Sequence, residues 1–221
     1  DNSGLKTLLM FESFLYVSSS NMTNYRWFGW LMDVTVKVSQ IPSCTDLFHH
    51  LKSECDKLNP LPKYNELCYD REIRYWFWRL DFAIWEQRKE LFKEDEDSVL
   101  LDVAENYVFI RNRSIEHVAP QHPKSDSVFK WEDTDSDKTV MNSFGNLVMI
   151  SQGLNSKLQN ESYEVKYAHV LSYCNKSKTG TIESLKLLMI YKDYKVWDKE
   201  SIQAHGKKMH EMLERYLVPK R

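Results

Sequence analysis

Apolar and aromatic side chains recur at spacings of three and four residues along the first hundred residues of the chain. The stretches concerned are residues 5–17, 23–38 and 70–91. This spacing gathers apolar side chains on one face of a helix, so each stretch predicts a helix. We interpret the dense aromatic residues of the third helix, such as Trp78 and Trp85, as core. Pro60 and Pro62 predict a loop between helical segments, because proline lacks an N–H and restricts the residue before it.

The pattern changes after a short, highly charged stretch, residues 93–98, and we place a boundary between residues 1–100 and 101–221. Residues 107–110 and 114–118 are β-branched and aromatic, which is typical of strands. Residues 122–142, which include Asp133, Asp135 and Asp137, are polar and acidic and predict a loop or insertion.

After that loop, residues 145–150 predict another strand, and residues 154–158 can open a helix. The tail returns to helical spacing in residues 163–173, 182–190 and 199–216. A unit of two strands and one helix is too small to bury enough apolar area alone, so we expect the tail helices to pack around it. The predicted fold class is α+β, mostly α, with a helical first half.

Composition narrows this picture in three respects. Six Gly and six Pro among 221 residues disfavour a turn-rich β-sandwich. Four cysteines without a CxxC pair, Cys44, Cys55, Cys68 and Cys174, are expected to be reduced thiols rather than zinc ligands. No apolar run is long enough to span a membrane and no signal segment opens the sequence, so we expect a soluble intracellular protein.

Charge is distributed unevenly along the chain. Residues 176–221 carry 11 basic and 6 acidic side chains, although the whole chain has a net charge of −2. A basic segment can bind phosphates through counterion release, which would suit nucleic acid. A solvated helical face rich in lysine explains the same pattern equally well.

Three short motifs follow one another in the second half of the chain. Two residues separate the pair Glu116 and His117 from Pro120 and Gln121; a Gly-Asn-Leu triplet contains Asn146; and Asn155 stands near the start of a predicted helix. In this order and spacing they resemble the HNH (β-β-α-metal, or His-Me finger) domain at the C-terminus of GmrSD-type restriction endonucleases. The order is also similar to that of the HNH domain in RNA-guided nucleases. The resemblance is specific over residues 114–160, weaker over 161–215 and nearly absent over 1–100.

The resemblance implies a metal-dependent DNA endonuclease module of a bacterial restriction or anti-phage system, located in the cytoplasm. Under it, His117 is the general base, Glu116 and Asn155 bind one Mg²⁺ or Mn²⁺, and Asn146 holds the loop or orients His117. Lys166 falls where the family often has a lysine and could contact phosphate, whereas the competing interpretation is a surface lysine. The family also implies an upstream nucleotide-binding domain of the same polypeptide, to which residues 1–100 would link. One departure concerns DNA contact, because His205 stands where the family usually has an arginine.

These residue types suit phosphodiester hydrolysis on chemical grounds. An imidazole with a pKa of about 6.5 can take a proton from water near neutral pH. Carboxylate and amide oxygens are ligands that Mg²⁺ and Mn²⁺ prefer. Neighbouring residues on a strand point to opposite sides, so Glu116 and His117 can share a site only where the strand twists or ends.

An alternative from another class remains open. The helical, acidic and aromatic first half could dock to a partner, while an HNH-like unit binds nucleic acid without cleaving it. Other histidines, including His122, form no ligand spacing with a carboxylate and are not predicted to bind metal.

Overall fold

The computed structural model describes residues 2–19, 26–36, 42–93, 99–125, 127, 129–176 and 182–217, except for the side chains of residues 173–176. Helices dominate this part of the chain, and its strands form one two-stranded antiparallel sheet. The elements are α1 (Asn2–Ser18), α2 (Arg26–Val36), α3 (Cys44–Leu58), the 3-10 helix η2 (Tyr64–Glu66), α4 (Arg74–Glu86), α5 (Arg88–Leu91), α6 (Val99–Glu105), β1 (Ser114–His117), α7 (Asp135–Met141), the 3-10 helix η3 (Phe144–Asn146), β2 (Leu147–Ile150), α8 (Gln152–Leu158), α9 (Tyr163–Lys176), α10 (Leu185–Asp193) and α11 (Lys199–Leu217). The expected class, α+β with mostly helix, is confirmed.

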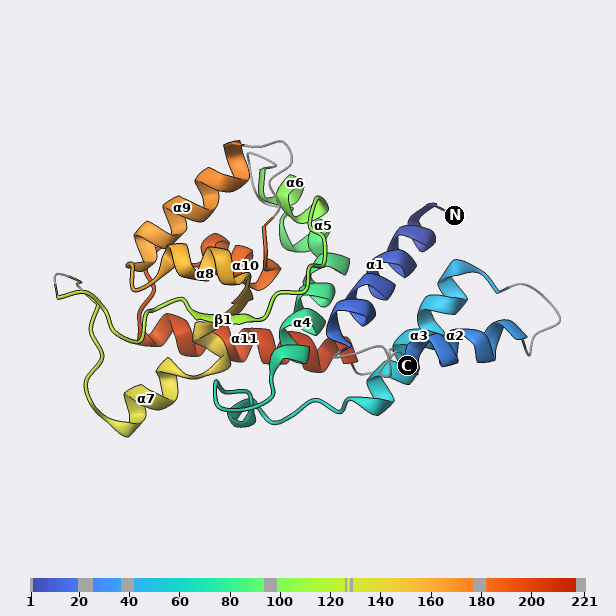
Figure 1. Cartoon of the computed structure of the whole chain (residues 1–221), viewed down its shortest axis with the longest axis horizontal. Coiled ribbons are helices and arrows are strands. Elements are labelled where there is room, and N and C mark those ends of the chain that lie inside the picture. The colour runs from blue at the N-terminus through green and yellow to red at the C-terminus, as the bar shows by residue number, and fades with distance from the viewer. Residues whose placement is uncertain are drawn as a thin grey trace.

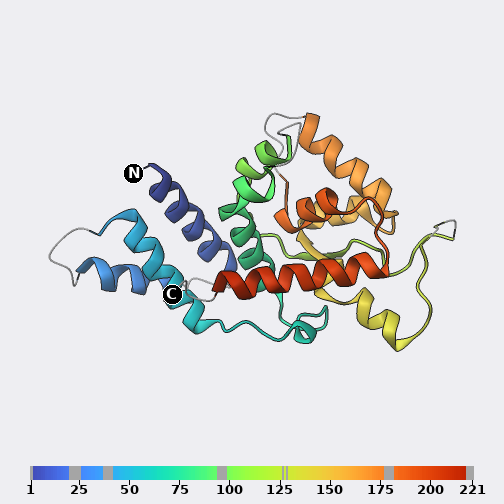
Figure 2. The same cartoon turned by 180° about the vertical axis from the view of Figure 1, so that it is seen from behind.

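Helix α4 is the centre of the core. Every side chain from residue 76 to residue 85 is buried, including the charged Arg79 and Asp81. In Figure 1, α4 stands between α1 on one side and the sheet with α10 on the other, and it contacts α1, α10, α11 and β2. Figure 2 shows the long helix α11 running across the molecule, where it packs against both α4 and η3. Elements on both sides of residue 100 therefore contribute to one hydrophobic core.

Residues 107–110, which the sequence predicted to be a strand, belong to no helix or sheet of the described chain. Tyr107 and Phe109 point into the core, where the Tyr107 hydroxyl donates to Asp81 and the Phe109 ring contacts Phe14. Val108 and Ile110 alternate with them and are exposed. The alternation of buried and exposed side chains expected of a strand is present. Among the described residues, however, no strand pairs with this segment, because helices pack against its inward side chains.

A helix replaces part of the predicted loop over residues 122–142. The Thr134 side chain accepts a hydrogen bond from the backbone N–H of Asp137 and caps the start of α7. Asp135 and Asp137 lie in the first turn, where carboxylates are favoured by the helix dipole. Asp137 also pairs with Lys199 of α11 at 2.7 Å. These acidic residues start a helix, so the loop prediction was wrong there.

Three of the four cysteines lie in the part of the chain whose side chains are described. Cys44, Cys55 and Cys68 are free thiols, as expected, and Cys174 lies outside the described side chains. A search of the described helices for one long and apolar enough to cross a bilayer finds none.

Gly145 lets α11 approach the turn before β2. A Cβ at residue 145 would collide with the backbone carbonyl of Ile202 and crowd the Cα of Gly206, both on α11. A Cβ at residue 206 would likewise meet Gly145 and the Tyr64 side chain. The glycine of the Gly-Asn-Leu triplet is therefore required by a close contact between backbones.

We predict that Gly145→Ala destabilises the protein, because the added methyl group must push α11 away from η3. Overpacking of this kind costs about 1–3 kcal/mol. Gly153, inside α8, has only the Ser151 hydroxyl within reach of an added Cβ, at 3.9 Å. Gly153→Ala is the matched control and should stabilise the protein by about 0.5–1 kcal/mol, since alanine favours a helix over glycine. Urea unfolding measures both, and equal stability of the two variants would contradict the proposed contact.

Candidate functional site

The sheet and α8 bring the three sequence motifs into one region. Strands β1 and β2 pair in antiparallel register, with Glu116 opposite Val148 and His117 opposite Leu147. Ser151 caps α8 directly after β2 by accepting a hydrogen bond from the N–H of Leu154. Helix α8 in turn packs against β1. The order strand, strand and helix predicted from the sequence is present, and the helix with Asn155 lies against the strand with Glu116 and His117.

His117, the last residue of β1, is held by two neighbours. Its Nε2 forms a 3.0 Å hydrogen bond with Oδ1 of Asn142, and its ring centroid lies 4.8 Å from that of Tyr69. The side chain is only 6% exposed. Burial lowers the pKa of His117 to about 4, aided by the nearby Lys166 charge, while the bond to Asn142 and the charge of Asp70 act in the opposite direction. The imidazole is therefore neutral at pH 7, as a general base must be.

The bond to Asn142 also determines the tautomer of His117. An amide oxygen accepts but cannot donate, so Nε2 must carry the proton and donate it to Asn142. The other nitrogen, Nδ1, then keeps its lone pair. The nitrogen able to accept a proton is thus Nδ1.

Glu116, the residue before His117, forms a buried ion pair. Nζ of Lys166, on α9, lies 2.5 Å from Oε1 of Glu116 and 2.8 Å from the backbone oxygen of His117. Burial raises the pKa of the Glu116 carboxyl, and the ammonium of Lys166 lowers it. Burial likewise lowers the pKa of Lys166, which Glu116 raises. The pair is stable only because each charge has a partner.

Lys166 is 1% exposed, so the interpretation as a surface lysine is wrong. Its ammonium group donates to a carboxylate and a backbone carbonyl instead. A contact with substrate phosphate stays a prediction, and the arrangement does not favour it. The lysine positions β1 by binding its last two residues.

Asn155 lies in the middle of α8 and is half-buried. Its backbone N–H donates to the Ser151 carbonyl, and no side-chain hydrogen bond of Asn155 is found among the described residues. The start of α8 is fixed by Glu183, whose carboxylate accepts from both the N–H and the hydroxyl of Ser151, at 2.6 and 2.9 Å. The helix is held rigidly while the amide of Asn155 stays available to a ligand.

Asn146 is fully buried and bridges three segments. Its Oδ1 accepts hydrogen bonds from the backbone N–H of Ala119 at 2.8 Å and from the indole of Trp197 at 3.1 Å. Its Nδ2 donates to the carbonyls of Ala119 and Met141, both at 3.0 Å. These bonds hold the loop that follows His117. They do not reach the imidazole, which Asn142 orients instead.

A buried lysine binds the backbone of the turn that contains Asn146. Nζ of Lys186 donates to the carbonyls of Gly145, at 3.2 Å, and Leu147, at 2.7 Å. Burial lowers the pKa of Lys186 to about 7, and the nearby Asp81 acts against this shift. Asp81, whose own pKa burial raises to about 7, accepts from the backbone N–H of Lys186 at 2.8 Å. The two carbonyls flanking Asn146 are thus bound to one ammonium.

The donor set can be compared with the needs of a divalent metal. Glu116 uses Oε1 for Lys166, and its other oxygen accepts no hydrogen bond from the described residues. This oxygen and the amide oxygen of Asn155 are hard donors, and Mg²⁺ commonly binds one or two protein oxygens and keeps several waters. Within the described residues, no three His, Cys, Asp or Glu side chains gather as a metal-binding group. The donor types of Glu116 and Asn155 are those that Mg²⁺ or Mn²⁺ prefers, and a metal site formed by these two residues stays a prediction.

The sequence analysis missed two residues that contact His117. Asn142 belongs to a segment predicted as a loop, and only its position four residues before Asn146 hints at a shared turn. Tyr69 comes from the loop before α4, whose backbone joins the site through a hydrogen bond from its N–H to the Asn142 carbonyl. His205, which stands where an arginine was expected, is fully buried against Tyr194 and Trp197 and cannot contact DNA.

Comparison with known proteins places this geometry in a family. A family model described as GmrSD restriction endonucleases, C-terminal domain, matches residues 62–212. The matched segment contains Tyr69 and α4 as well as the sheet, α8 and α9. No curated protein and no solved structure is detectably similar to the chain.

We predict that the neutral imidazole of His117 carries its proton on Nε2. Nitrogen-15 NMR of the chain labelled at histidine distinguishes the two tautomers. In Asn142→Leu the acceptor is lost, and a hydrogen bond worth about 1 kcal/mol changes the tautomer ratio by roughly fivefold. The control Asn160→Leu, at an exposed residue, should leave the His117 signals unchanged. A wild-type proton on Nδ1 would contradict the assignment.

Proposed function

The chain belongs to the family of GmrSD restriction endonuclease C-terminal domains, and on that premise we propose that it is a metal-dependent DNA endonuclease module of HNH type. The proposal places phosphodiester hydrolysis at His117, Glu116 and Asn155. It assigns the module to a bacterial defence protein of the cytoplasm, in which an upstream nucleotide-binding domain decides when DNA is cut.

One observation supports the proposal most directly. A neutral imidazole, oriented by Asn142, ends a strand whose preceding residue is a carboxylate. A helix packs against that strand, and its Asn155 amide has no hydrogen-bond partner among the described residues. A base and hard oxygen donors are what hydrolysis of a phosphodiester requires.

In the proposed reaction, Nδ1 of His117 accepts a proton from the attacking water. Asn142 keeps Nε2 protonated throughout, so the ring cannot present the wrong nitrogen. Asn146 holds the loop that follows His117, and Lys166 holds its backbone oxygen. The backbone on either side of the His117 ring is thus held in place before substrate binds. This lowers the entropic cost of orienting the imidazole in the transition state.

Glu116 and Asn155 would hold the metal. Bound there, Mg²⁺ or Mn²⁺ supplies Lewis-acid stabilisation of the charge on the phosphate and the leaving oxygen. Lys166 orients Glu116 and favours its ionised form, because the ammonium acts against the larger rise in the carboxyl pKa that burial causes. Lys166 is therefore proposed as a positioning residue rather than a phosphate ligand.

A second function has one specific observation in its favour. The ammonium of Lys166 already neutralises Glu116, and both Glu116 and His117 are more than nine-tenths buried. A module that binds nucleic acid or a partner without cleaving DNA could keep such an ion pair as a purely structural feature.

Plasmid cleavage tests the leading function. With Mg²⁺ or Mn²⁺ we expect the chain to nick or linearise supercoiled plasmid, and chelation with EDTA to abolish the reaction. Loss of a general base lowers the rate by roughly 10²–10⁴-fold, and His117→Ala should show a decrease of this size. His122→Ala is the matched control, because His122 is exposed and lies five residues away. Equal cutting by His117→Ala and the wild type would refute the assignment.

Metal titration separates the two functions. For a nuclease site, calorimetry with Mn²⁺ should give binding heat that disappears when Glu116→Gln and Asn155→Ala are combined. Glu116→Gln keeps the size of the side chain but leaves the buried Lys166 without its charge partner, so thermal unfolding of the same sample is needed to verify folding. Identical heats for wild type and double variant would favour the non-catalytic module.

A further inference from the structure

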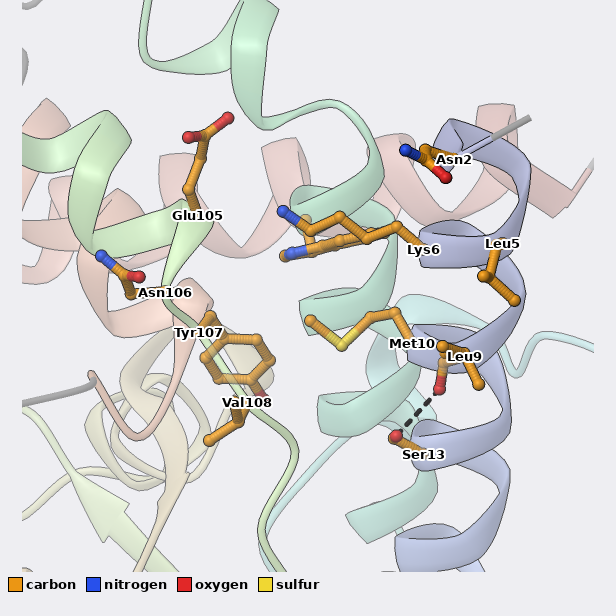
Figure 3. A pocket seen from close by; sticks show the side chains of 11 residues that line it. Asn2, Leu5, Lys6, Leu9, Met10, Ser13, Glu105, Asn106, Tyr107 and Val108 are labelled. Atoms are coloured by element: carbon orange, nitrogen blue, oxygen red, sulfur yellow. Dashed lines mark hydrogen bonds between the residues drawn. The ribbon is translucent and has the colours of Figure 1, made fainter. Parts of the chain in front are cut away.

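A groove lies between α1 and the segment that follows α6, and none of the residues assigned to hydrolysis lines it. Its cavity has a volume of about 540 Å³, within the range of sites that hold small ligands or short peptide segments. In Figure 3, α1 and the segment containing Asn106, Tyr107 and Val108 flank the groove, and the Met10 side chain extends from α1 towards its interior. Its walls are mostly apolar, with Leu5, Leu9 and Val108 exposed at the rim.

The backbone beside this groove has unused hydrogen-bonding groups. Residues 107–110 belong to no helix or strand, and within the described chain the N–H groups of Val108, Phe109 and Ile110 and the carbonyls of Val108 and Phe109 have no partner. Val108 is 50% exposed and Ile110 39%, while Tyr107 and Phe109 are anchored in the core. The segment is therefore a rigid, strand-shaped edge that lacks its neighbour.

Two nitrogen donors at the groove are also uncommitted. Trp85, which is 1% exposed, forms part of the lining, and its Nε1 has no hydrogen-bond partner among the described residues. Nζ of Lys6 lies 6.0 Å from the centroid of the Trp85 ring and forms no ion pair with a described residue. On the other side of the groove, Glu105 already lies 3.8 Å from Arg88. The unbalanced charge in the groove is thus the cation of Lys6.

We infer that this groove binds an extended peptide segment of a partner protein, which adds a strand to the edge formed by residues 107–110. The unpaired backbone groups recognise another extended backbone, as in β-strand addition. An apolar side chain of the peptide enters the space beside Met10 and Leu9, and an acidic side chain or terminal carboxylate meets Lys6.

These observations favour a peptide strand over other occupants. A helix satisfies its own backbone groups and would leave the N–H groups of Val108 and Ile110 unpaired. A second copy of the chain would present Val108 and Ile110 again, with no carboxylate at those positions for Lys6. The inference is independent of the nuclease proposal, because it uses none of the residues assigned to hydrolysis.

Selection from a phage-displayed library of random dodecapeptides on the full chain tests the inference. We expect the enriched peptides to combine an apolar residue with a neighbouring acidic residue. Val108→Pro removes a backbone donor, and loss of one or two hydrogen bonds should weaken peptide binding by roughly tenfold. Val108→Thr keeps the donor and is the matched control.

Lys6→Glu provides a second variant that does not alter the backbone, because Lys6 is exposed. It should weaken binding by about tenfold in low salt, whereas the charge-matched control Lys207→Glu, on the exposed side of α11, should not. Hydrogen exchange of the amides of Val108 and Ile110 should slow when a selected peptide is bound. Both cleavage of plasmid and Mn²⁺ binding should remain unchanged in these variants.

Three results would overturn the inference. The first is the absence of any enriched peptide, and the second is equal binding of the selected peptides to Lys6→Glu, Val108→Pro and wild type. The third is self-association of the wild-type chain in light scattering that Val108→Pro abolishes, since the occupant would then be a second copy.

Discussion

The hydrogen bonds of Asn146 hold the described site together. One buried amide joins the loop after β1 at Ala119, the end of α7 at Met141 and the indole of Trp197. Each group is withdrawn from water, so an unmade bond at any of them would cost about 1–3 kcal/mol. The surrounding features serve to keep this amide in place: Lys186 binds the carbonyls on either side of it, and Gly145 admits α11 behind it.

With the turn fixed, the two chemical residues of β1 acquire opposite environments. The strand directs Glu116 towards α9, where Lys166 compensates its charge, and directs His117 towards Asn142 and Tyr69. Adjacent residues thereby become a paired carboxylate and a neutral imidazole, although both are buried. Burial raises the pKa of the Glu116 carboxyl and lowers that of the His117 imidazole, and the ammonium of Lys166 acts against the shift of Glu116. The separation of roles comes from the alternation of the strand.

Local patterns predicted the parts of this arrangement that depend on periodicity or on a contiguous motif. The helices, the strand bearing Glu116, and the order of strand, strand and helix follow from spacing that the chain shows directly. Residues contributed by other segments were missed, because Tyr69 and Asn142 meet His117 only through the packing of the loop before α4 against the turn before β2. Residues 107–110 were predicted as a strand for a different reason. Their buried and exposed side chains do alternate, but packing against helices, and not pairing with another strand, produces the alternation.

The unpaired edge and the proposed metal-binding helix are connected by a short series of contacts. Residues 107–110 lead along the chain to the buried Asn112, whose side chain donates to the backbone carbonyl of Glu183 at 3.1 Å. The carboxylate of Glu183 binds Ser151 at the start of α8. A strand docked at Val108 that shifted Asn112 would therefore act on the cap of the helix that carries Asn155. These consecutive contacts supply a physical route between the two sites. The coupling free energy along this route is the amount by which a bound peptide would change the affinity for metal, and bound metal would change the affinity for the peptide by the same amount.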